Sequence, residues 1–310
     1  MTRLLSRKEK SKTAKNGGAN GKYKKSKRLS ILISAKQNKA GLRAAHRMEK
    51  ELSKFADVHF DKSTAQKRMR WRMRGIAVSK FKGDLIITLG GDGTFLWTAY
   101  QSSVPILPVR IEGHGFLCTT DYKDLLANIK AVAQRKWTII KRMRLRATKM
   151  RQGIIEKFLH RNYPCALNEI AFARKRPSKV LKVEFSIDGT PFSFWGDGVM
   201  FATPAGSTAY ASSAGGPLID PALEAISIIP LYPFHSKIKP MLVPAAKRVE
   251  VRLKGGDCAL IIDGHTGEYV KAGSSFIVEK GEPIQVATLG DVKFYERYRH
   301  QFIENEAGEM

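Results

Sequence analysis

The stretch LIITLGGDGTFLWTA, residues 85–99, places a glycine-rich turn with one acidic residue directly after a run of apolar residues. The run LIITL has the length and composition of a buried strand, and TFLWTA has the character of a helix start. We therefore expect a strand, a tight turn and a helix N-terminus, which form the building block of a parallel α/β sheet. The acidic residue, Asp92, is either a helix cap in this turn or a chemical group beside a bound ligand.

The segments around this turn favour the same architecture. A helix over residues 41–55 would place Ala45, Met48, Leu52 and Phe55 on one face, with charged residues elsewhere. Further strands are expected at 28–36, 56–60 and 104–111, and a closing helix at 122–137. Alternation of strands and helices over about 110 residues indicates an open, mostly parallel sheet with helices on both faces.

From about residue 140 the pattern changes to short alternating segments separated by turn residues, which is typical of an all-β sandwich. The last segment returns to helical character and is placed to pack back on the first domain. We therefore expect a fold of an α/β N-terminal domain plus an all-β sandwich, with the active site in the crevice between them. The expected divisions are a tail at 1–28, an α/β domain at 29–140, a sandwich at 141–285 and a helical segment at 286–310.

The chain is strongly basic, with 54 Lys and Arg against 28 Asp and Glu and a net charge of +26, which predicts affinity for anions. Residues 1–28 carry eleven Lys or Arg against one Glu and few apolar residues, and we interpret them as a disordered basic tail. No secretory pattern and no membrane-spanning apolar run is present, so a cytoplasmic location is expected. Three isolated cysteines, Cys118, Cys165 and Cys258, indicate free buried thiols.

The turn itself is suited to phosphate. Backbone N–H groups and the helix dipole favour an anion where a strand end meets a helix N-terminus, and glycines let a phosphate approach closely. An aspartate is electrostatically unsuited to bind a phosphate passively, but it suits a base beside that phosphate or a holder of its magnesium ion. The alternative is a plain turn with a capping aspartate. The candidate residues are Gly90, Gly91, Asp92, Gly93 and Thr94.

A second candidate is ALNEIAFAR, residues 166–174, which sets Asn168 and Glu169 side by side at a strand start. Neighbours in a strand face opposite sides, so both reach one ligand only where the backbone twists. Two ordinary polar residues at a strand start are the alternative interpretation.

A third candidate is WGDGVMFATPAGSTAYASSAGGPLIDP, residues 195–221, which is dense in Gly, Ala, Ser and Thr. This composition suits a backbone that lies against a flat ligand, with Tyr210 covering an aromatic ring. Close packing of a strand and a helix through small side chains is the alternative. Asp197, between two glycines, also suits an ordinary turn.

Taken together and in this order, the motifs resemble the NAD kinase family over roughly residues 30–300. The resemblance rests on GGDGTFL, ALNEIAFAR, GDGVMFATPAGSTAYASSAGGP, PMLVPA and IIDGH. It implies magnesium-dependent transfer of a phosphoryl group from ATP, polyphosphate or another donor to the 2′-hydroxyl of the adenosine ribose of NAD, which gives NADP. NAD and ATP are then substrates, and Mg²⁺ is the expected cofactor.

The resemblance also implies roles for single residues. Asp92 would be the base that activates the ribose hydroxyl, and the glycines around it would admit the phosphates of the donor. Asn168 and Glu169 would hold the adenosine ribose or adenine, and Phe116 would pack near the adenine. Asp197 would reach the nicotinamide end of an NAD bound to a neighbouring subunit, as in a homodimer or homotetramer. The NAD pocket would be lined by Thr208, Ala209, Tyr210 and Ser213; no residue is assigned as a metal ligand.

The sequence departs from the family pattern at three places. The usual TPTGSTAY is TPAGSTAY, so Ala205 lacks a hydroxyl, and we expect little loss from this change. VRIEGHGFL carries Arg110 and Glu112 where Asn and Gly would stand, which leaves the contacts of this loop open. Tyr232, Pro233 and Phe234 replace a Cys-Pro-His step, and no role is assigned to the following residue, His235.

Two other functions fit part of the pattern. A lipid kinase of the same superfamily shares GGDGT, but it should expose apolar residues around its acceptor cleft, whereas residues 203–213 are small and polar. The net charge of +26 also suits a nucleic-acid-binding protein, yet no recognisable nucleic-acid motif accompanies it. We expect neither nucleic acid nor a membrane as a partner.

Overall fold

The structure of the chain is a computed structural model that describes residues 28–68, 75–113, 115–150 and 161–304. The predicted basic tail therefore lies outside the described residues, apart from Arg28. The basic stretch KRMRWRMRG, residues 67–75, which suits a helix or a loop, also lies partly outside them.

Four parallel strands form the first part of the molecule, in the order β4-β3-β1-β2. Their residues are apolar on both faces, as a parallel sheet covered by helices requires. Ile31 and Ile33 pack beneath helix α1, while Leu32 faces Phe95 of helix α3 on the opposite side. The predicted strand and helix alternation is confirmed. The elements are β1 (Leu29–Ala35), α1 (Lys39–Leu52), β2 (Ala56–Phe60), α2 (Lys62–Arg68), η1 (Val78–Lys80), β3 (Leu85–Gly90), α3 (Asp92–Ala99) and β4 (Ile106–Arg110).

The closing helix predicted at 122–137 is two short helices instead. Asn128 ends α4 and begins α5 with a non-helical backbone, φ −109° and ψ 18°. Asparagine competes for backbone hydrogen bonds and is weak inside helices, which accounts for the break. The elements here are β5 (Thr120–Asp121), α4 (Tyr122–Ala127) and α5 (Ile129–Ala133).

The second part is a sandwich of two sheets with an apolar interior. Leu145, Phe276 and Val251 of one sheet face Phe172 and Phe201 of the other. The first sheet contains β6 (Thr138–Met150), β7 (Arg161–Asn162), β9 (Leu181–Ile187), β10 (Thr190–Gly196), β14 (Val249–Lys254) and β17 (Ser275–Thr288). The second runs β13 (Met241–Pro244), β12 (Ala225–Leu231), β11 (Gly198–Ala202), β8 (Glu169–Arg174), β15 (Cys258–Ile262) and β16 (His265–Val270). The predicted pairing of an α/β part with an all-β part is confirmed.

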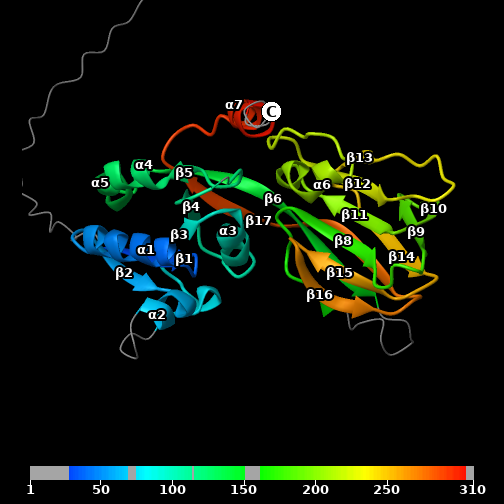
Figure 1. Cartoon of the computed structure of the whole chain (residues 1–310), viewed down its shortest axis with the longest axis horizontal. Helices are drawn as coiled ribbons and strands as arrows, with labels where there is room; N and C mark the ends of the chain where they lie inside the picture. Colours follow the sequence, from blue (N-terminus) through cyan, green and yellow to red (C-terminus); the bar gives the residue numbers. More distant parts are fainter. Residues whose placement is uncertain (1–27, 69–74, 114, 151–160, 305–310) are drawn as a thin grey trace, which may run out of the picture.

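One strand, β17, belongs to both parts. It pairs with β6 along its length, with β14 at its start and, in parallel, with β4 where Val286 lies beside Ile106. An eleven-stranded sheet therefore runs from the α/β part into the sandwich (Figure 1). The boundary predicted at residue 285 falls inside this strand, so residues 286–288 are extended.

The remaining helices are short. η3 (Ala205–Thr208) and α6 (Tyr210–Ser213) follow β11, and α7 (Phe294–Arg299) continues into a π-helical turn, η4 (His300–Glu304). α7 lies over the junction of the two parts in Figure 1. None of the described helices is long and apolar enough to cross a membrane.

Candidate active site

The GGDGT turn leaves space on one side. β3 ends at Gly90, and Gly91 is the N-cap of α3 without a side-chain capping bond. A Cβ atom on Gly91 or Gly93 would meet nothing within 4 Å, whereas one on Gly90 would lie 2.2 Å from Thr94 Oγ1. Gly90 is therefore required by packing, while Gly91 and Gly93 leave room for an anion at the helix N-terminus.

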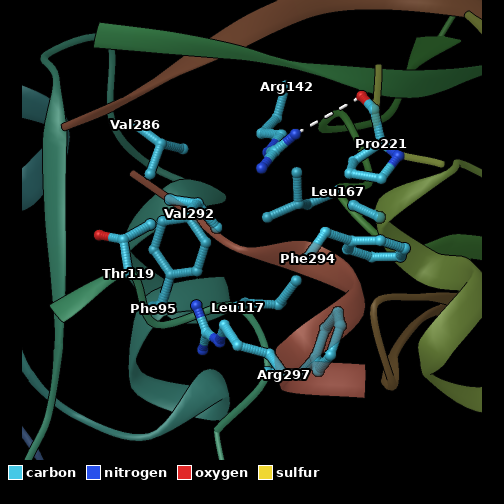
Figure 2. Close-up of a pocket in the computed structure, with 12 residues that line it drawn as sticks. Phe95, Leu117, Thr119, Arg142, Leu167, Pro221, Val286, Val292, Phe294 and Arg297 are labelled. Atoms are coloured by element: carbon cyan, nitrogen blue, oxygen red, sulfur yellow. Dashed lines mark hydrogen bonds between the residues drawn. The ribbon is translucent and has the colours of Figure 1, made fainter. Parts of the chain in front are cut away.

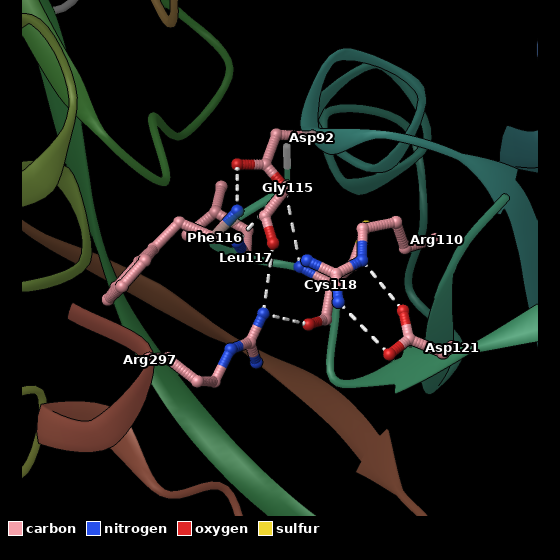
Figure 3. Close-up of polar contacts among 8 residues, drawn as sticks. All are labelled: Asp92, Arg110, Gly115, Phe116, Leu117, Cys118, Asp121 and Arg297. Atoms are coloured by element: carbon pink, nitrogen blue, oxygen red, sulfur yellow. Dashed lines mark hydrogen bonds and ion pairs between the residues drawn. The ribbon is translucent and has the colours of Figure 1, made fainter. Parts of the chain in front are cut away.

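Asp92 does not cap its helix. Its carboxylate accepts hydrogen bonds from three consecutive backbone N–H groups of another loop: Phe116 at 2.8 Å, Leu117 at 2.9 Å and Cys118 at 3.3 Å (Figure 3). The helix-cap interpretation is therefore wrong. Of these N–H groups, only that of Phe116 reaches Oδ2, so this oxygen keeps the capacity to accept a further hydrogen bond.

The surroundings of Asp92 alter its acidity. Burial raises the pKa of the Asp92 carboxyl above its usual range, although the three N–H groups act in the opposite direction. A carboxylate with a raised pKa is a better proton acceptor. Burial and the neighbouring Asp92 charge also raise the pKa of the Cys118 thiol, which is therefore not a thiolate nucleophile. All three cysteines are free; Cys118 and Cys258 are buried and Cys165 is partly buried.

Arg110, which departs from the family pattern, forms a bidentate pair with Asp121. Its Nε lies 2.6 Å from Oδ1 and its Nη2 lies 3.0 Å from Oδ2. Since the pair joins the end of β4 to β5, it closes the loop between them at its base.

A second aspartate fixes the Asn168 and Glu169 motif. The Asp263 carboxylate accepts the backbone N–H groups of Leu167 at 2.7 Å, Asn168 at 2.7 Å and Glu169 at 3.1 Å. Asp263 itself has a left-handed backbone, φ 46°, which aspartate tolerates better than most residues. The backbone of the motif is thereby held from the neighbouring strand, and its side chains are free to serve a ligand.

Those side chains carry unmatched polar atoms. Asn168 is 6% exposed and Glu169 4%, yet Asn168 Oδ1 and Glu169 Oε2 have no hydrogen-bond partner within the described part of the chain. Buried polar atoms are satisfied in nearly all native structures, so these two unpartnered atoms on adjacent residues are candidate contacts for a polar ligand. Burial, and then the charge of Asp263, raise the pKa of Glu169 to about 7.

The TPAGST stretch packs directly against this motif. Thr203 donates its N–H to Asn168 O at 2.9 Å and its hydroxyl to Leu167 O at 2.5 Å. A Cβ on Gly206 would lie 2.1 Å from Asn168 O. The close-packing interpretation therefore holds for Gly206. The residues after Gly206 that were predicted to line the NAD pocket are partly or fully exposed, and Tyr210 is half exposed. They are Thr208, Ala209, Tyr210 and Ser213.

An apolar cavity of about 40 Å³ lies where the two parts of the molecule meet (Figure 2). Residues of both parts and of the C-terminal segment line it. Phe116, which was predicted to lie in the site, is one of these residues. Ala205 packs in the same cluster as Phe95 and Leu167, so the missing hydroxyl is replaced by apolar contact. The lining residues are Phe95, Phe116, Leu117, Thr119, Arg142, Leu167, Ala205, Pro221, Val286, Val292, Phe294 and Arg297.

Asp197 lies away from this cluster. It precedes β11, whose first residue pairs with Ala173 while its last pairs with Glu169, a separation of roughly 14 Å along the strand. Asp197 forms an ion pair with Arg174 at 3.0 Å. Near it, Phe234 donates its N–H to Trp195 O, and the rings of Phe234 and His235 are in contact at 4.1 Å. His235 is exposed, and it is not among the residues that line the cavity described above.

Sequence reasoning missed Asp263 and Arg297 as parts of the site. The Asp263–Gly264 step is a typical turn signal and lies in the quoted IIDGH motif, but nothing local indicates hydrogen bonds to residues 94 to 96 positions earlier. Arg297 lies in a basic helical segment with no motif at all.

The raised pKa of Glu169 makes stability depend on pH. The native state keeps a proton that the unfolded chain loses near the ordinary value of 4.5, so the stability from this group falls as pH rises from 4.5 to about 7. We expect Glu169→Gln to lessen the fall in unfolding free energy across this window by up to about 3 kcal/mol. Urea denaturation at a series of pH values measures the unfolding free energy of each protein. Glu250→Gln, at an exposed strand position, is the control. Equal pH slopes for the Glu169 variant and the parent would contradict this assignment.

Comparison with known proteins extends over both parts. A family model described as the ATP-NAD kinase N-terminal domain matches residues 15–137, and one described as the ATP-NAD kinase C-terminal domain matches residues 167–287. The NAD kinase of Methanothermobacter thermautotrophicus is 30% identical over 259 residues, which cover 82% of this chain and 88% of the relative. That of Methanopyrus kandleri is 33% identical over 225 residues, which cover 71% and 78%.

Solved structures share the fold. Yeast NADH kinase complexed with NADH superposes with a TM-score of 0.80 at 20% identity, over 90% of this chain and 88% of that one. An NAD kinase from Archaeoglobus fulgidus in complex with ATP gives 0.64 at 23% identity, over 88% and 96%. With both parts matched in order, and with a relative of 30% identity matched over most of its length, this chain belongs to the NAD kinase family.

Proposed function

We propose that the crevice between the two parts binds NAD and that the chain transfers a phosphoryl group to the 2′-hydroxyl of its adenosine ribose. As a member of the NAD kinase family, the chain is an enzyme that phosphorylates NAD to NADP. The observation that supports the proposed position of NAD is the pair of buried, unmatched atoms Asn168 Oδ1 and Glu169 Oε2. Ribose hydroxyls and the adenine amino group are donors that would satisfy them.

Asp92 would act as the base. The ribose hydroxyl attacks the terminal phosphorus of the donor, and its proton passes to Asp92 Oδ2, the oxygen that can accept a further hydrogen bond. The bond from that phosphorus to its bridging oxygen breaks, so the donor leaves one phosphate shorter, as ADP when the donor is ATP. The open side of Gly91 and Gly93, at the N-terminus of α3, would receive the negative charge of the donor phosphates. The glycines of the turn thus serve the donor, the Asn168 motif serves NAD, and Asp92 lies between them.

Magnesium fits this site as part of the substrate. Among the described residues, no group of three or more His, Cys, Asp or Glu side chains is placed to hold a metal ion. Mg²⁺ prefers a shell of water and substrate phosphate oxygens, so we expect it to enter bound to the nucleotide. It would neutralise charge on the transferred phosphoryl group.

The lipid-kinase and nucleic-acid alternatives lose support because both parts of the chain match NAD kinase domains. A cytoplasmic location stays a prediction from the sequence.

The activity is tested with purified protein, Mg²⁺ and either NAD or NADH, supplied in turn with ATP, other nucleoside triphosphates or polyphosphate. The product, NADP from NAD or NADPH from NADH, is read with an NADP-specific dehydrogenase. We expect NADP with ATP, and the rates with the other donors rank donor use. NADP at background with every donor would refute the proposed function.

Asp92→Asn tests the base. The amide keeps the size of the side chain but cannot take the proton, so kcat should fall by about a hundredfold to ten-thousandfold. An amide also places an N–H against one of the three backbone donors, so some loss of thermal stability is expected as well. NAD should still raise the melting temperature of the variant. Substantial NADP formation by this variant would exclude Asp92 as the base.

We further propose a homo-oligomer in which Asp197 reaches the NAD of a partner subunit. Asp197 lies roughly 14 Å along β11 from the Asn168 motif of its own chain, too far to share one small group with it. Three exposed aromatic side chains lie close to Asp197, either along the chain or on the strand segment that pairs with it, and exposed aromatic residues are typical of an interface. They are Trp195, Tyr232 and Phe234.

Subunit mixing tests this arrangement. Asp92→Asn and Asp197→Ala should each be nearly inactive alone. In a dimer that holds one of each, one site regains both aspartates, so random pairing should restore about a quarter of the parent activity. Light scattering on the same samples reports the oligomeric state. A mixture no more active than its components, or a monomeric parent, would contradict the shared site.

A further inference from the structure

The loop that binds Asp92 is itself held from the C-terminal segment. Arg297 of α7 donates from one guanidinium nitrogen, Nη2, to Gly115 O at 3.0 Å and to Cys118 O at 2.5 Å. These two carbonyls bracket the residues whose N–H groups bind Asp92 (Figure 3). One peptide segment thus presents its N–H groups to Asp92 and its carbonyl groups to Arg297.

Arg297 is placed unlike its neighbours on the helix. It is partly buried, and burial together with the nearby Arg110 lowers the pKa of its guanidinium, while the negative charge of Asp92 acts in the opposite direction. Its guanidinium also lies 5.6 Å from the centre of the Phe116 ring. Arg299, two residues on, is exposed and pairs with Glu304. A cation that is costly to bury is therefore directed at the loop rather than at solvent.

α7 has contacts of its own that do not involve Arg297. The Tyr295 hydroxyl donates to Asp220 at 2.7 Å, which joins α7 to the segment after α6. Phe294 of α7 and Phe302 of the following turn η4 pack against Phe116, with ring centres 5.4 Å and 5.8 Å from that of Phe116. Since these contacts dock the helix, Arg297 is not needed merely to keep it in place.

We propose that Arg297 is a positioning residue for phosphoryl transfer, which holds the loop of residues 115–118 so that its N–H groups orient the Asp92 carboxylate toward the ribose hydroxyl. This inference rests on the proposed function. The contacts form a continuous chain from the Arg297 guanidinium through two carbonyls and three N–H groups to the carboxylate. Without the arginine the carbonyls lose a charged donor, and the loop can turn its N–H groups away from Asp92.

The test compares Arg297→Ala and Arg297→Lys with two controls on the same segment. Arg299→Ala removes an exposed arginine, and Tyr295→Phe removes the hydrogen bond from α7 to Asp220. We expect Arg297→Ala to lower kcat by about tenfold to a hundredfold while KM for NAD changes by less than about threefold, because orientation and not substrate binding is lost. Arg297→Lys should recover part of kcat, and both controls should stay within about twofold of the parent.

Chemical rescue separates positioning from a general loss of structure. Guanidinium chloride, at millimolar concentrations far below those that unfold proteins, should restore part of the kcat of Arg297→Ala. It should not restore Asp92→Asn, in which the carboxylate is absent. Thermal unfolding of each variant, with and without NAD, confirms that it is folded.

Three outcomes would overturn the inference while the parent forms NADP. They are an unchanged kcat in Arg297→Ala, an equal loss in Tyr295→Phe, and a loss in Arg297→Ala that appears in KM alone. A parent that forms no NADP would instead refute the proposed function.

Discussion

The site depends on one interaction used twice: a buried aspartate that accepts three consecutive backbone N–H groups from a distant segment. Asp92 binds residues 116–118 in this way, and Asp263 binds residues 167–169. Hydrogen bonds to a charged acceptor contribute roughly 1.5–3 kcal/mol each, so either set is strong enough to fix a loop. Because the aspartates bind the backbone N–H groups of these segments, the side chains of Phe116, Asn168 and Glu169 are available to the cavity and to a ligand.

Burial and hydrogen bonding oppose each other at these carboxylates. The N–H groups favour the charged form, but burial outweighs them and raises the pKa of both Asp92 and Asp263. Among the residues that the structure describes, no N–H group binds the Glu169 carboxylate, and its pKa rises to about 7. The raised pKa of Asp92 suits the proton transfer proposed for it, whereas Glu169 can present either a donor or an acceptor to a ligand near neutral pH. The same geometry therefore sets both the structure of the site and its acid–base character.

Sequence patterns predicted the elements better than their assembly. The strand at 85–90, the glycine turn and the small-residue stretch follow from local composition, because apolar runs, Gly and Asn have strong local preferences. The division predicted at residue 285 falls inside β17, because this strand pairs with strands of both parts within one sheet and a strand's second partner leaves no local signal. The hydrogen-bond partners of Asp92 and Asp263 could not be predicted either, because an Asp–Gly turn does not indicate which distant N–H groups its carboxylate binds. Arg297 matched no motif, since its partners are carbonyls, which every residue has.

The loop of residues 110–121 shows how a departure from the family pattern is accommodated. Where the pattern has Asn and Gly, this chain has Arg110 and Glu112. The loop is held from three directions: at its base by the Arg110 pair with Asp121, on its N–H side by Asp92, and on its carbonyl side by Arg297. Arg110 and Arg297 repel each other, yet each faces an acceptor on the loop or at its base, and both are attracted by the charge of Asp92. The Asp92 carboxylate, which the turn places at the end of β3, thereby stabilises the loop that orients it. The position of Asp92 and the conformation of the loop therefore depend on each other.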